Sequence, residues 1–111
     1  MTKAYDVLII GAGPAGIFCT YELIKQNKDL KILMVDKGRE IHLRQCPIPK
    51  TGQCAHCEPC NIMYGWAGAG AFSDGKLSLS PDVGGQLADY IGHSQAQDMI
   101  NYTDDIYRHF G

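Results

Sequence analysis

The sequence predicts an α/β fold that opens with a strand–helix–strand unit, and three observations lead to this class. Residues 4–11, AYDVLIIG, are β-branched and apolar and end on glycine, which is typical of a buried parallel strand. Residues 14–27, PAGIFCTYELIKQN, place apolar side chains at helical spacing, with Pro14 in the first turn and Asn27 at the stop. Residues 31–36, KILMVD, form a second strand that ends on an acid. We therefore expect a βαβ unit with a right-handed crossover.

The remainder of the chain divides by composition into three segments, which we expect to complete one partial domain of 111 residues after the βαβ unit at 1–37. Residues 38–64 are rich in cysteine and irregular, because their prolines break any long helix. Residues 65–80 begin as a second glycine-rich loop and continue as a short strand-like piece. Residues 81–111 carry a helical pattern.

Two helices are predicted in this last segment, a short one within 84–92 and a longer one over 94–110. Ser94 and Gln97 have the spacing of a capping box at the start of the longer helix. An apolar stripe along that helix predicts packing in the core or against a second copy of the chain. Its members are Ala96, Met99, Ile100, Ile106, Tyr107 and Phe110.

Composition and charge exclude several classes of function. A net charge of −2 gives no patch for nucleic acid or for an acidic membrane surface. No apolar run of about 18 residues is present, so we expect no membrane span. The apolar stretch 7–19 is broken by glycines and by Pro14, which makes a poor signal peptide, and we expect the protein to be cytoplasmic. Cysteines in that compartment indicate metal ligands, redox groups or buried thiols, and for Cys19, on the first predicted helix, we expect only packing.

A glycine motif joins the first predicted strand to the helix. It reads Gly11-Ala12-Gly13-Pro14-Ala15-Gly16, which is G-x-G-x-x-G. Gly11 permits a sharp turn, Gly13 lets the backbone approach a pyrophosphate, and Gly16 lets the helix pack close to the strands. The helix N-terminus offers N–H groups to phosphates, and Asp36 can accept hydrogen bonds from a ribose diol. In this order the motif predicts a Rossmann-type dinucleotide site rather than a plain turn beside a solvated acid.

The residues after the second predicted strand refine the choice of nucleotide. The Asp36 carboxylate would repel a 2′-phosphate, which disfavours a phosphorylated ribose. Lys37 and Arg39 leave a phosphorylated ribose open as an alternative, and are more simply solvated charges or lids on the adenine.

The quoted segments resemble a known family. DVLIIGAGPAGIFCTYEL and KILMVDKG resemble the start of two-domain FAD flavoproteins of the glutathione-reductase-like group, and residues 46–80 resemble an uncharacterised group of FAD-dependent dehydrogenases of bacteria and archaea. The resemblance implies that the bound dinucleotide is FAD. It implies FAD contacts at Gly11, Gly13, Gly16 and Asp36. We expect the neighbouring residues Pro14, Ala15 and Lys37 to belong to the same cofactor site. It also implies that GWAGAGAFSDGK, residues 65–76, runs beside the flavin and pyrophosphate, with Ser73 and Lys76 as donors to FAD oxygens.

The chain departs from the resembled family in length. Members of the group run to several hundred residues and close the FAD site with a late Gly-Asp motif, and neither feature occurs in these 111 residues. We therefore expect the N-terminal piece of a larger flavoprotein, the FAD-binding portion of an oxidoreductase. The alternatives are a non-catalytic dinucleotide-binding or assembly module and a flavin-linked dithiol or disulfide reductase. Histidines 42, 56, 93 and 109 are scattered, so we expect surface positions for them.

Four cysteines fall within fifteen residues, and three hypotheses about their role stay open. They are Cys46, Cys54, Cys57 and Cys60. Overlapping C-x-x-C pairs predict ligands for an iron–sulfur cluster or for zinc, with His56 as a spare ligand. A redox dithiol next to the flavin is the second reading, because in flavin-dependent disulfide reductases a cysteine pair follows the acid-ended strand. Reduced thiols in an ordered loop are the third.

Overall fold

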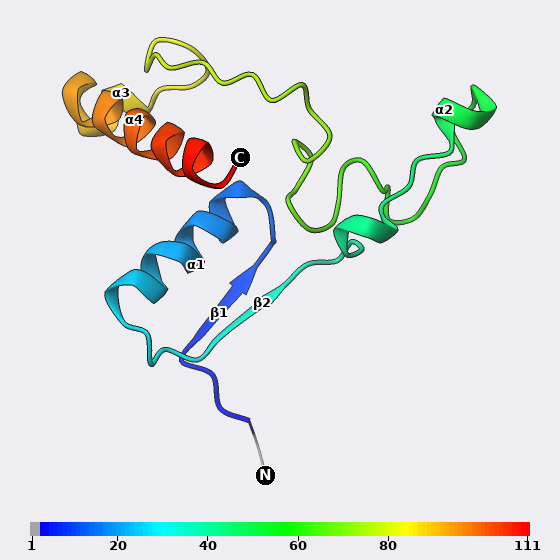
Figure 1. Cartoon of the computed structure of the whole chain (residues 1–111), viewed down its shortest axis with the longest axis horizontal. Coiled ribbons are helices and arrows are strands. Elements are labelled where there is room, and N and C mark those ends of the chain that lie inside the picture. The colour runs from blue at the N-terminus through cyan, green and yellow to red at the C-terminus, as the bar shows by residue number, and fades with distance from the viewer. Residues whose placement is uncertain (1–2) are drawn as a thin grey trace. The chain divides into compact units, whose positions relative to one another are not determined.

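The predicted βαβ unit is present at the start of the chain (Figure 1). Strands β1 (Val7–Ile10) and β2 (Ile32–Val35) pair in parallel, and helix α1 (Pro14–Gln26) connects them. The register places Val7 opposite Ile32 and Ile10 opposite Val35. Both strands are shorter than the apolar runs that predicted them, whereas α1 begins at Pro14 and is capped by Asn27, as expected.

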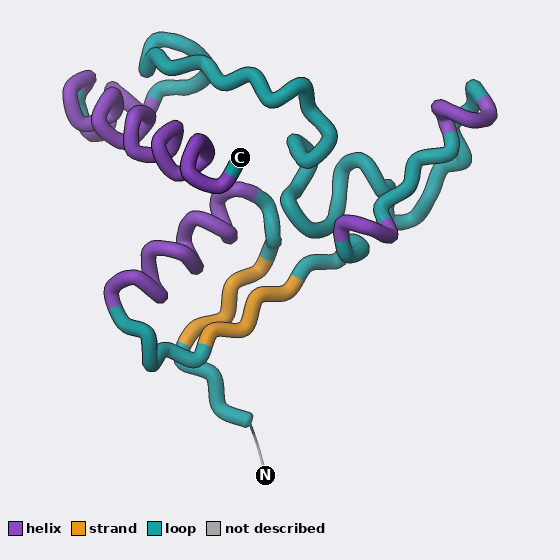
Figure 2. Tube along the Cα trace, viewed as in Figure 1, coloured by secondary structure: helices purple, strands orange, loops and turns teal. Residues whose placement is uncertain are grey.

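The computed structural model describes residues 3–111, and these fall into two compact units, one ending at Ser73 and the other spanning Asp74–Gly111. The first unit contains the βαβ unit and a long excursion that is mostly loop (Figure 2). Two short helical turns interrupt the excursion, a 3-10 turn η1 (Ile41–Leu43) and α2 (Ile48–Thr51). The expectation of an irregular segment without a long helix is therefore confirmed.

The second unit contains α3 (Leu87–Ile91) and α4 (His93–Phe110), which pack on each other. The strand-like piece expected before residue 81 is wrong. In the described chain the sheet has only the strands β1 and β2, and residues 77–80 form a loop. A strand needs a neighbour to satisfy its backbone groups, and this segment has none.

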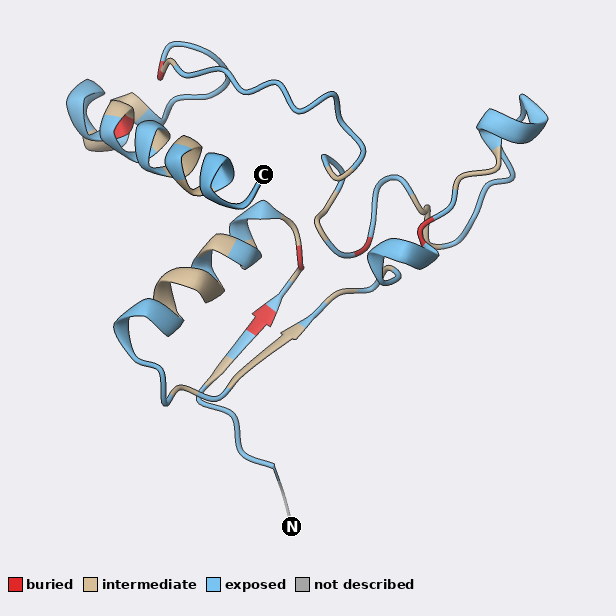
Figure 3. Cartoon of the chain, in the orientation of Figure 1, coloured by how far each residue is buried: buried red, intermediate tan, exposed pale blue. Residues whose placement is uncertain are grey.

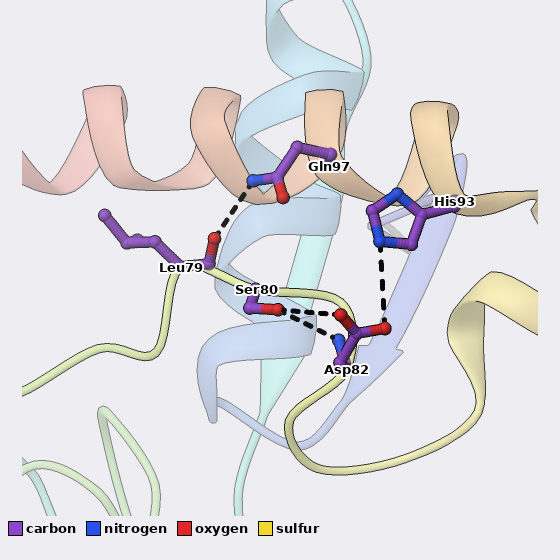
Figure 4. Close-up of polar contacts among 5 residues, drawn as sticks. All are labelled: Leu79, Ser80, Asp82, His93 and Gln97. Atoms are coloured by element: carbon purple, nitrogen blue, oxygen red, sulfur yellow. Dashed lines mark hydrogen bonds and ion pairs between the residues drawn. The ribbon is translucent and has the colours of Figure 1, made fainter.

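The predicted capping box of α4 is also wrong. The helix begins one residue earlier, at His93, because Gly92 (φ +83°) ends α3 and serves directly as the N-cap of α4. The Gln97 amide instead donates to the carbonyl of Leu79 at 3.0 Å (Figure 4). In the same picture the His93 ring pairs with Asp82 across 3.7 Å. These contacts hold the preceding loop along the first turns of α4.

The core of the described chain is small (Figure 3). Its buried apolar side chains are Ile9, Ala12 and Ala96. On β1, Ile10 keeps 82% of its surface exposed, although both faces of a parallel sheet are usually covered. In the α4 stripe only Ala96 is buried, and Phe110 is 70% exposed, so the expectation of core packing holds for one of its six members.

The expectation for Cys19 is likewise corrected, because its side chain is exposed on α1, a helix without a buried residue. Among residues 3–111 no helix combines the length and the apolar character that a membrane crossing requires.

Candidate functional site

The glycine turn between β1 and α1 leaves no room for a side chain at Gly16 and holds Gly11 in a conformation that favours glycine. Gly11 has φ +104°, a conformation that side chains disfavour, and its N–H donates to the Val35 carbonyl at 2.7 Å. A Cβ at Gly16 would run into the Gly11 carbonyl oxygen and meet the Ile9 side chain at 3.2 Å. Gly16 therefore lets α1 start directly against the strand, as the motif predicts.

Gly13 differs from Gly16 because it has room. A Cβ at Gly13 would have the Gly68 Cα at 3.8 Å as its nearest neighbour, which is an ordinary contact. The folded chain alone does not require glycine at this position. A requirement there would come from a bound group that approaches the first turn of α1, where no side chain of the described residues caps the helix.

Asp36 is tied to the glycine turn. Its Oδ2 accepts a hydrogen bond from the N–H of Ala12 at 2.9 Å, and its Oδ1 accepts one from the N–H of Gly38 at 2.8 Å. The Ala12 bond, followed by the Gly38 bond, lowers the pKa of the Asp36 carboxyl, with a smaller contribution from the charge of Arg44. The group is therefore an anion at neutral pH. The N–H of Gly65 is a third backbone donor to this carboxylate, so of its roughly four acceptor positions about one is left open.

A cavity of about 620 Å³ opens at the carboxyl ends of the two strands. Ligands of open α/β sheets bind at this edge. The ammonium of Lys37 lies 3.5 Å from the centroid of the Tyr64 ring, which makes a cation–π contact at the rim. The residues that line the cavity are Ile10, Gly11, Val35, Asp36, Lys37 and Tyr64.

The second glycine loop packs backbone to backbone on the first. The N–H of Ala67 donates to the Ala12 carbonyl at 2.9 Å. Gly68 has φ +73°, and a Cβ there would lie 3.0 Å from the Gly13 Cα and 3.1 Å from the Pro14 ring. The glycines thus let the loop come close to the turn that precedes α1, within the first unit.

Arg44 holds residues 61–66, the last part of the excursion, in place, and no sequence pattern predicts this role. Its side chain is buried, with 4% exposed, and it donates to the carbonyls of Asn61 at 2.8 Å, Ile62 at 2.7 Å and Trp66 at 2.5 Å. The guanidinium also lies 5.0 Å from the Phe72 ring centroid. Its partners are backbone carbonyls, which every residue has, so no residue pattern marks the contact in advance.

The four clustered cysteines line one cavity of about 250 Å³, called here the cysteine cavity. Apolar side chains, including those of Ile48, Ile62 and Met63, complete its wall. All five cysteines of the chain are free thiols. Within residues 3–111 no group of three or more His, Cys, Asp or Glu side chains is arranged to hold a single metal ion. A preformed zinc site is therefore absent from this arrangement, with or without His56. The cysteines that line the cavity are Cys46, Cys54, Cys57 and Cys60.

Two of these thiols have backbone N–H groups directed at them. The N–H of His56 lies 3.4 Å from the Cys54 sulfur. The N–H groups of Met63 and, to a lesser degree, Ile62 lower the pKa of the Cys60 thiol. These N–H groups therefore favour the thiolate form of Cys60.

The two predicted FAD donors Ser73 and Lys76 lie on either side of the boundary between the two units. Lys76 is 88% exposed at its side chain and pairs with Asp74 across 3.2 Å. It lies in the second unit, whereas Ser73 ends the first. The four histidines are exposed, as expected.

Comparison with known proteins agrees with the dinucleotide motif. Residues 5–88 match the family described as pyridine nucleotide-disulphide oxidoreductase. A protein of Clostridium beijerinckii described as uncharacterized is 33% identical over 72 residues, which cover 64% of this chain and 13% of that protein. A thiamine thiazole synthase of Coprinopsis cinerea is 54% identical over 33 residues, covering 30% of this chain and 10% of that enzyme.

The chain thus spans only about a tenth of the length of these relatives. No solved structure matches it. The family match covers most of the chain, including the glycine turn, Asp36 and the second glycine loop. With its βαβ unit and glycine turn, the chain belongs to the pyridine nucleotide-disulphide oxidoreductase family, whose domains bind FAD or NAD.

Proposed function

We propose that this chain is the FAD-binding portion of an oxidoreductase. The observation that carries the proposal is the combination of an uncapped α1 N-terminus, a glycine at position 13 that the fold itself does not need, and an acid at the edge of a cavity. FAD supplies hydride or electron transfer when bound, while the chain binds and orients it. Acting in the cytoplasm is consistent with five free thiols.

Different residues of the chain would bind different parts of FAD. The first turn of α1 would receive the pyrophosphate beside Gly13 and Pro14, and the N–H groups of Ala15 and Gly16 at the helix end would donate to it, since Pro14 has no N–H. Asp36 would accept a hydrogen bond from a ribose hydroxyl through the acceptor position that the N–H groups of Ala12, Gly38 and Gly65 leave open. A phosphorylated ribose is disfavoured, because the Asp36 carboxyl is anionic.

The rim of the cavity supports an adenine site. The Lys37–Tyr64 contact places a flat aromatic ring and a cation next to Asp36. Tyr64 is 42% exposed, so its ring has surface left for stacking. The second glycine loop, held against the turn by the Ala67–Ala12 bond, would follow the pyrophosphate and flavin.

A second candidate is a dinucleotide-binding or assembly module without catalysis. It is favoured by the two backbone bonds of Asp36, which stabilise the turn in the absence of any nucleotide. A chain of this kind would keep its fold whether or not it binds a cofactor.

Titration of the full chain with FAD, and in parallel with NAD, separates the candidates. We expect FAD to bind with quenching of flavin fluorescence and with higher affinity than NAD. A chain with Asp36→Ala should bind FAD more weakly than the wild type. Asp29→Ala is its matched control, because it removes an exposed acid before β2 rather than the acid after it. A folded chain that binds neither nucleotide would refute the FAD proposal and support the module.

A further inference from the structure

A buried arginine holds the backbone segment that borders the strand-end cavity. Arg44 exposes 4% of its side chain and donates to three carbonyls, the last of them that of Trp66. Arginine is almost never fully buried unless it is paired, and the partners here are neutral carbonyls. Burial of this charge therefore holds the chain in one arrangement near the cavity, and the FAD proposal gives Arg44 no contact with the cofactor.

The Gly65 peptide is fixed between Arg44 and the turn that follows β2. Gly65 is buried and has φ +117°, and a Cβ there would meet the Arg44 Cδ at 2.7 Å and its Nε at 3.0 Å. On the other side, a Cβ at Gly38 would run into the Gly65 nitrogen. The bond from Arg44 to the Trp66 carbonyl anchors the residue that follows Gly65.

The Gly65 N–H reaches the carboxylate of Asp36. It is the third backbone donor to this group, after those of Ala12 and Gly38. The first two donors belong to the glycine turn and to the residues directly after β2, whereas the third comes from the end of the excursion. Together the three leave about one acceptor position of the carboxylate open.

The same segment carries the aromatic ring at the rim of the strand-end cavity. Tyr64, directly before Gly65, lines this cavity together with Asp36 and Lys37, and its ring contacts the Lys37 ammonium. Arg44 itself is not one of the described residues that line the cavity. A shift of residues 64–66 would therefore move both the donor to Asp36 and the Tyr64 ring, without any change at a lining residue.

We propose that Arg44 is a positioning residue of the dinucleotide site, which keeps the Gly65 N–H on Asp36 and so orients the acceptor left for a ribose hydroxyl. It acts through the backbone of residues 64–66 and touches no part of the nucleotide. The assignment to a ribose rests on the proposed FAD function. The hold on Asp36 does not, because its contacts are made in the chain without a nucleotide.

The first test uses the full chain without FAD. Nuclear magnetic resonance measures the pKa of the Asp36 carboxyl and the exchange rate of the Gly65 amide. In Arg44→Met we expect faster Gly65 exchange and a rise of the Asp36 pKa toward its ordinary value of 3.8, because a donor to the charged form is lost.

Arg39→Met is the matched control, since it removes a charge from an exposed position in the same segment and should leave both values near those of the wild type. The other titratable side chains at the cavity, Lys37 and Tyr64, are the same in all variants and keep their charge in this acid range.

The second test is a double-mutant cycle on FAD affinity. Arg44→Met should raise the dissociation constant about tenfold in the wild-type background and much less in the Asp36→Ala background, where the group that Arg44 orients is already gone. A residue that only stabilised the fold would cause equal losses in the two backgrounds. Arg44→Lys keeps the charge but lacks the planar fork that reaches three carbonyls, so we expect an intermediate loss. It replaces Arg44→Met if that variant does not fold.

Several outcomes would overturn the proposal. One is a Gly65 amide that exchanges as slowly in Arg44→Met as in the wild type, even if the Asp36 pKa rises, because the charge alone would then act on Asp36. Others are equal losses of affinity in the two backgrounds and tighter FAD binding by Arg44→Met. A wild type that binds no FAD would refute the proposed function instead, and the Gly65 and Asp36 measurements would still decide whether Arg44 holds this carboxylate.

Discussion

The backbone N–H of Ala12 donates a hydrogen bond of 2.9 Å to the carboxylate of Asp36, across 24 residues of sequence. This bond joins the glycine turn after β1 to the end of β2, so the acid shapes the turn as well as facing the cavity. The sequence motif assigns Asp36 to a ribose alone. The structure adds a second role that exists before any nucleotide binds.

The two roles predict that Asp36→Ala weakens both FAD binding and the fold. Loss of a charged acceptor from the ribose should raise the dissociation constant by a factor that corresponds to about 1–3 kcal/mol. FAD titration of Asp36→Ala and of the Asp29→Ala control measures this difference. An unchanged affinity in a folded Asp36→Ala chain would mean that the ribose is held elsewhere.

The same bonds predict a dependence of stability on pH. The folded chain lowers the pKa of Asp36 below its ordinary value of 3.8, so the carboxylate stabilises the fold above that value. As the pH falls below 3.8, the unfolded chain takes up the proton first, and the contribution is lost as the pH passes through the lower folded pKa.

Urea unfolding of the wild type and of Asp36→Asn, compared between pH 7 and pH 3, measures this contribution. We expect the wild type to be the more stable at pH 7 and the difference to shrink toward the acid end. A difference that is constant over the range would show that the charge of Asp36 does not stabilise the turn.

Glycines 13 and 16 should respond differently to substitution. Gly16→Ala should destabilise the chain, because its Cβ would overlap the Gly11 carbonyl, which is backbone and cannot swing aside. Gly13→Ala adds a methyl group with 3.8 Å to its nearest neighbour, so the fold should persist.

FAD binding should nevertheless weaken in Gly13→Ala and vanish in Gly13→Val, because the side chain occupies space next to the pyrophosphate. Thermal unfolding and FAD titration of the three variants give the two readouts. Full affinity in Gly13→Val would place the pyrophosphate away from this turn.

The sequence predicted the features that depend on local pattern. Alternation of strand and helix periods located the βαβ unit, and Pro14 and Asn27 marked the ends of α1. The cluster of cysteines was found by spacing alone, and the structure places its four members around one cavity.

Features that depend on distant contacts escaped the sequence. The prediction of a capping box at Ser94 and Gln97 was wrong because Gly92 allows a tight turn, so that α4 begins at His93. Gln97 then donates its hydrogen bond to the Leu79 carbonyl. Cys19 is exposed because few elements are present to cover α1, a condition that its helical pattern does not report. The hydrogen bonds that Arg44 donates could not be predicted from the sequence, because their acceptors are main-chain carbonyls.

Arg44→Met should loosen the excursion. The substitution keeps an apolar stem next to Phe72 but leaves three carbonyls, those of Asn61, Ile62 and Trp66, without their donor. Hydrogen bonds from a charged donor contribute about 1.5–3 kcal/mol each, and water that enters the opened loop will offset part of the loss. We therefore expect a lower free energy of unfolding and faster amide exchange over residues 61–68. Arg39→Met is the matched control, since it removes the same charge from an exposed position in the same segment. Limited proteolysis of residues 45–66 gives a further comparison of the two variants. If Arg44→Met is cut no faster than Arg39→Met, the excursion is held by its own backbone turns rather than by the Arg44 side chain.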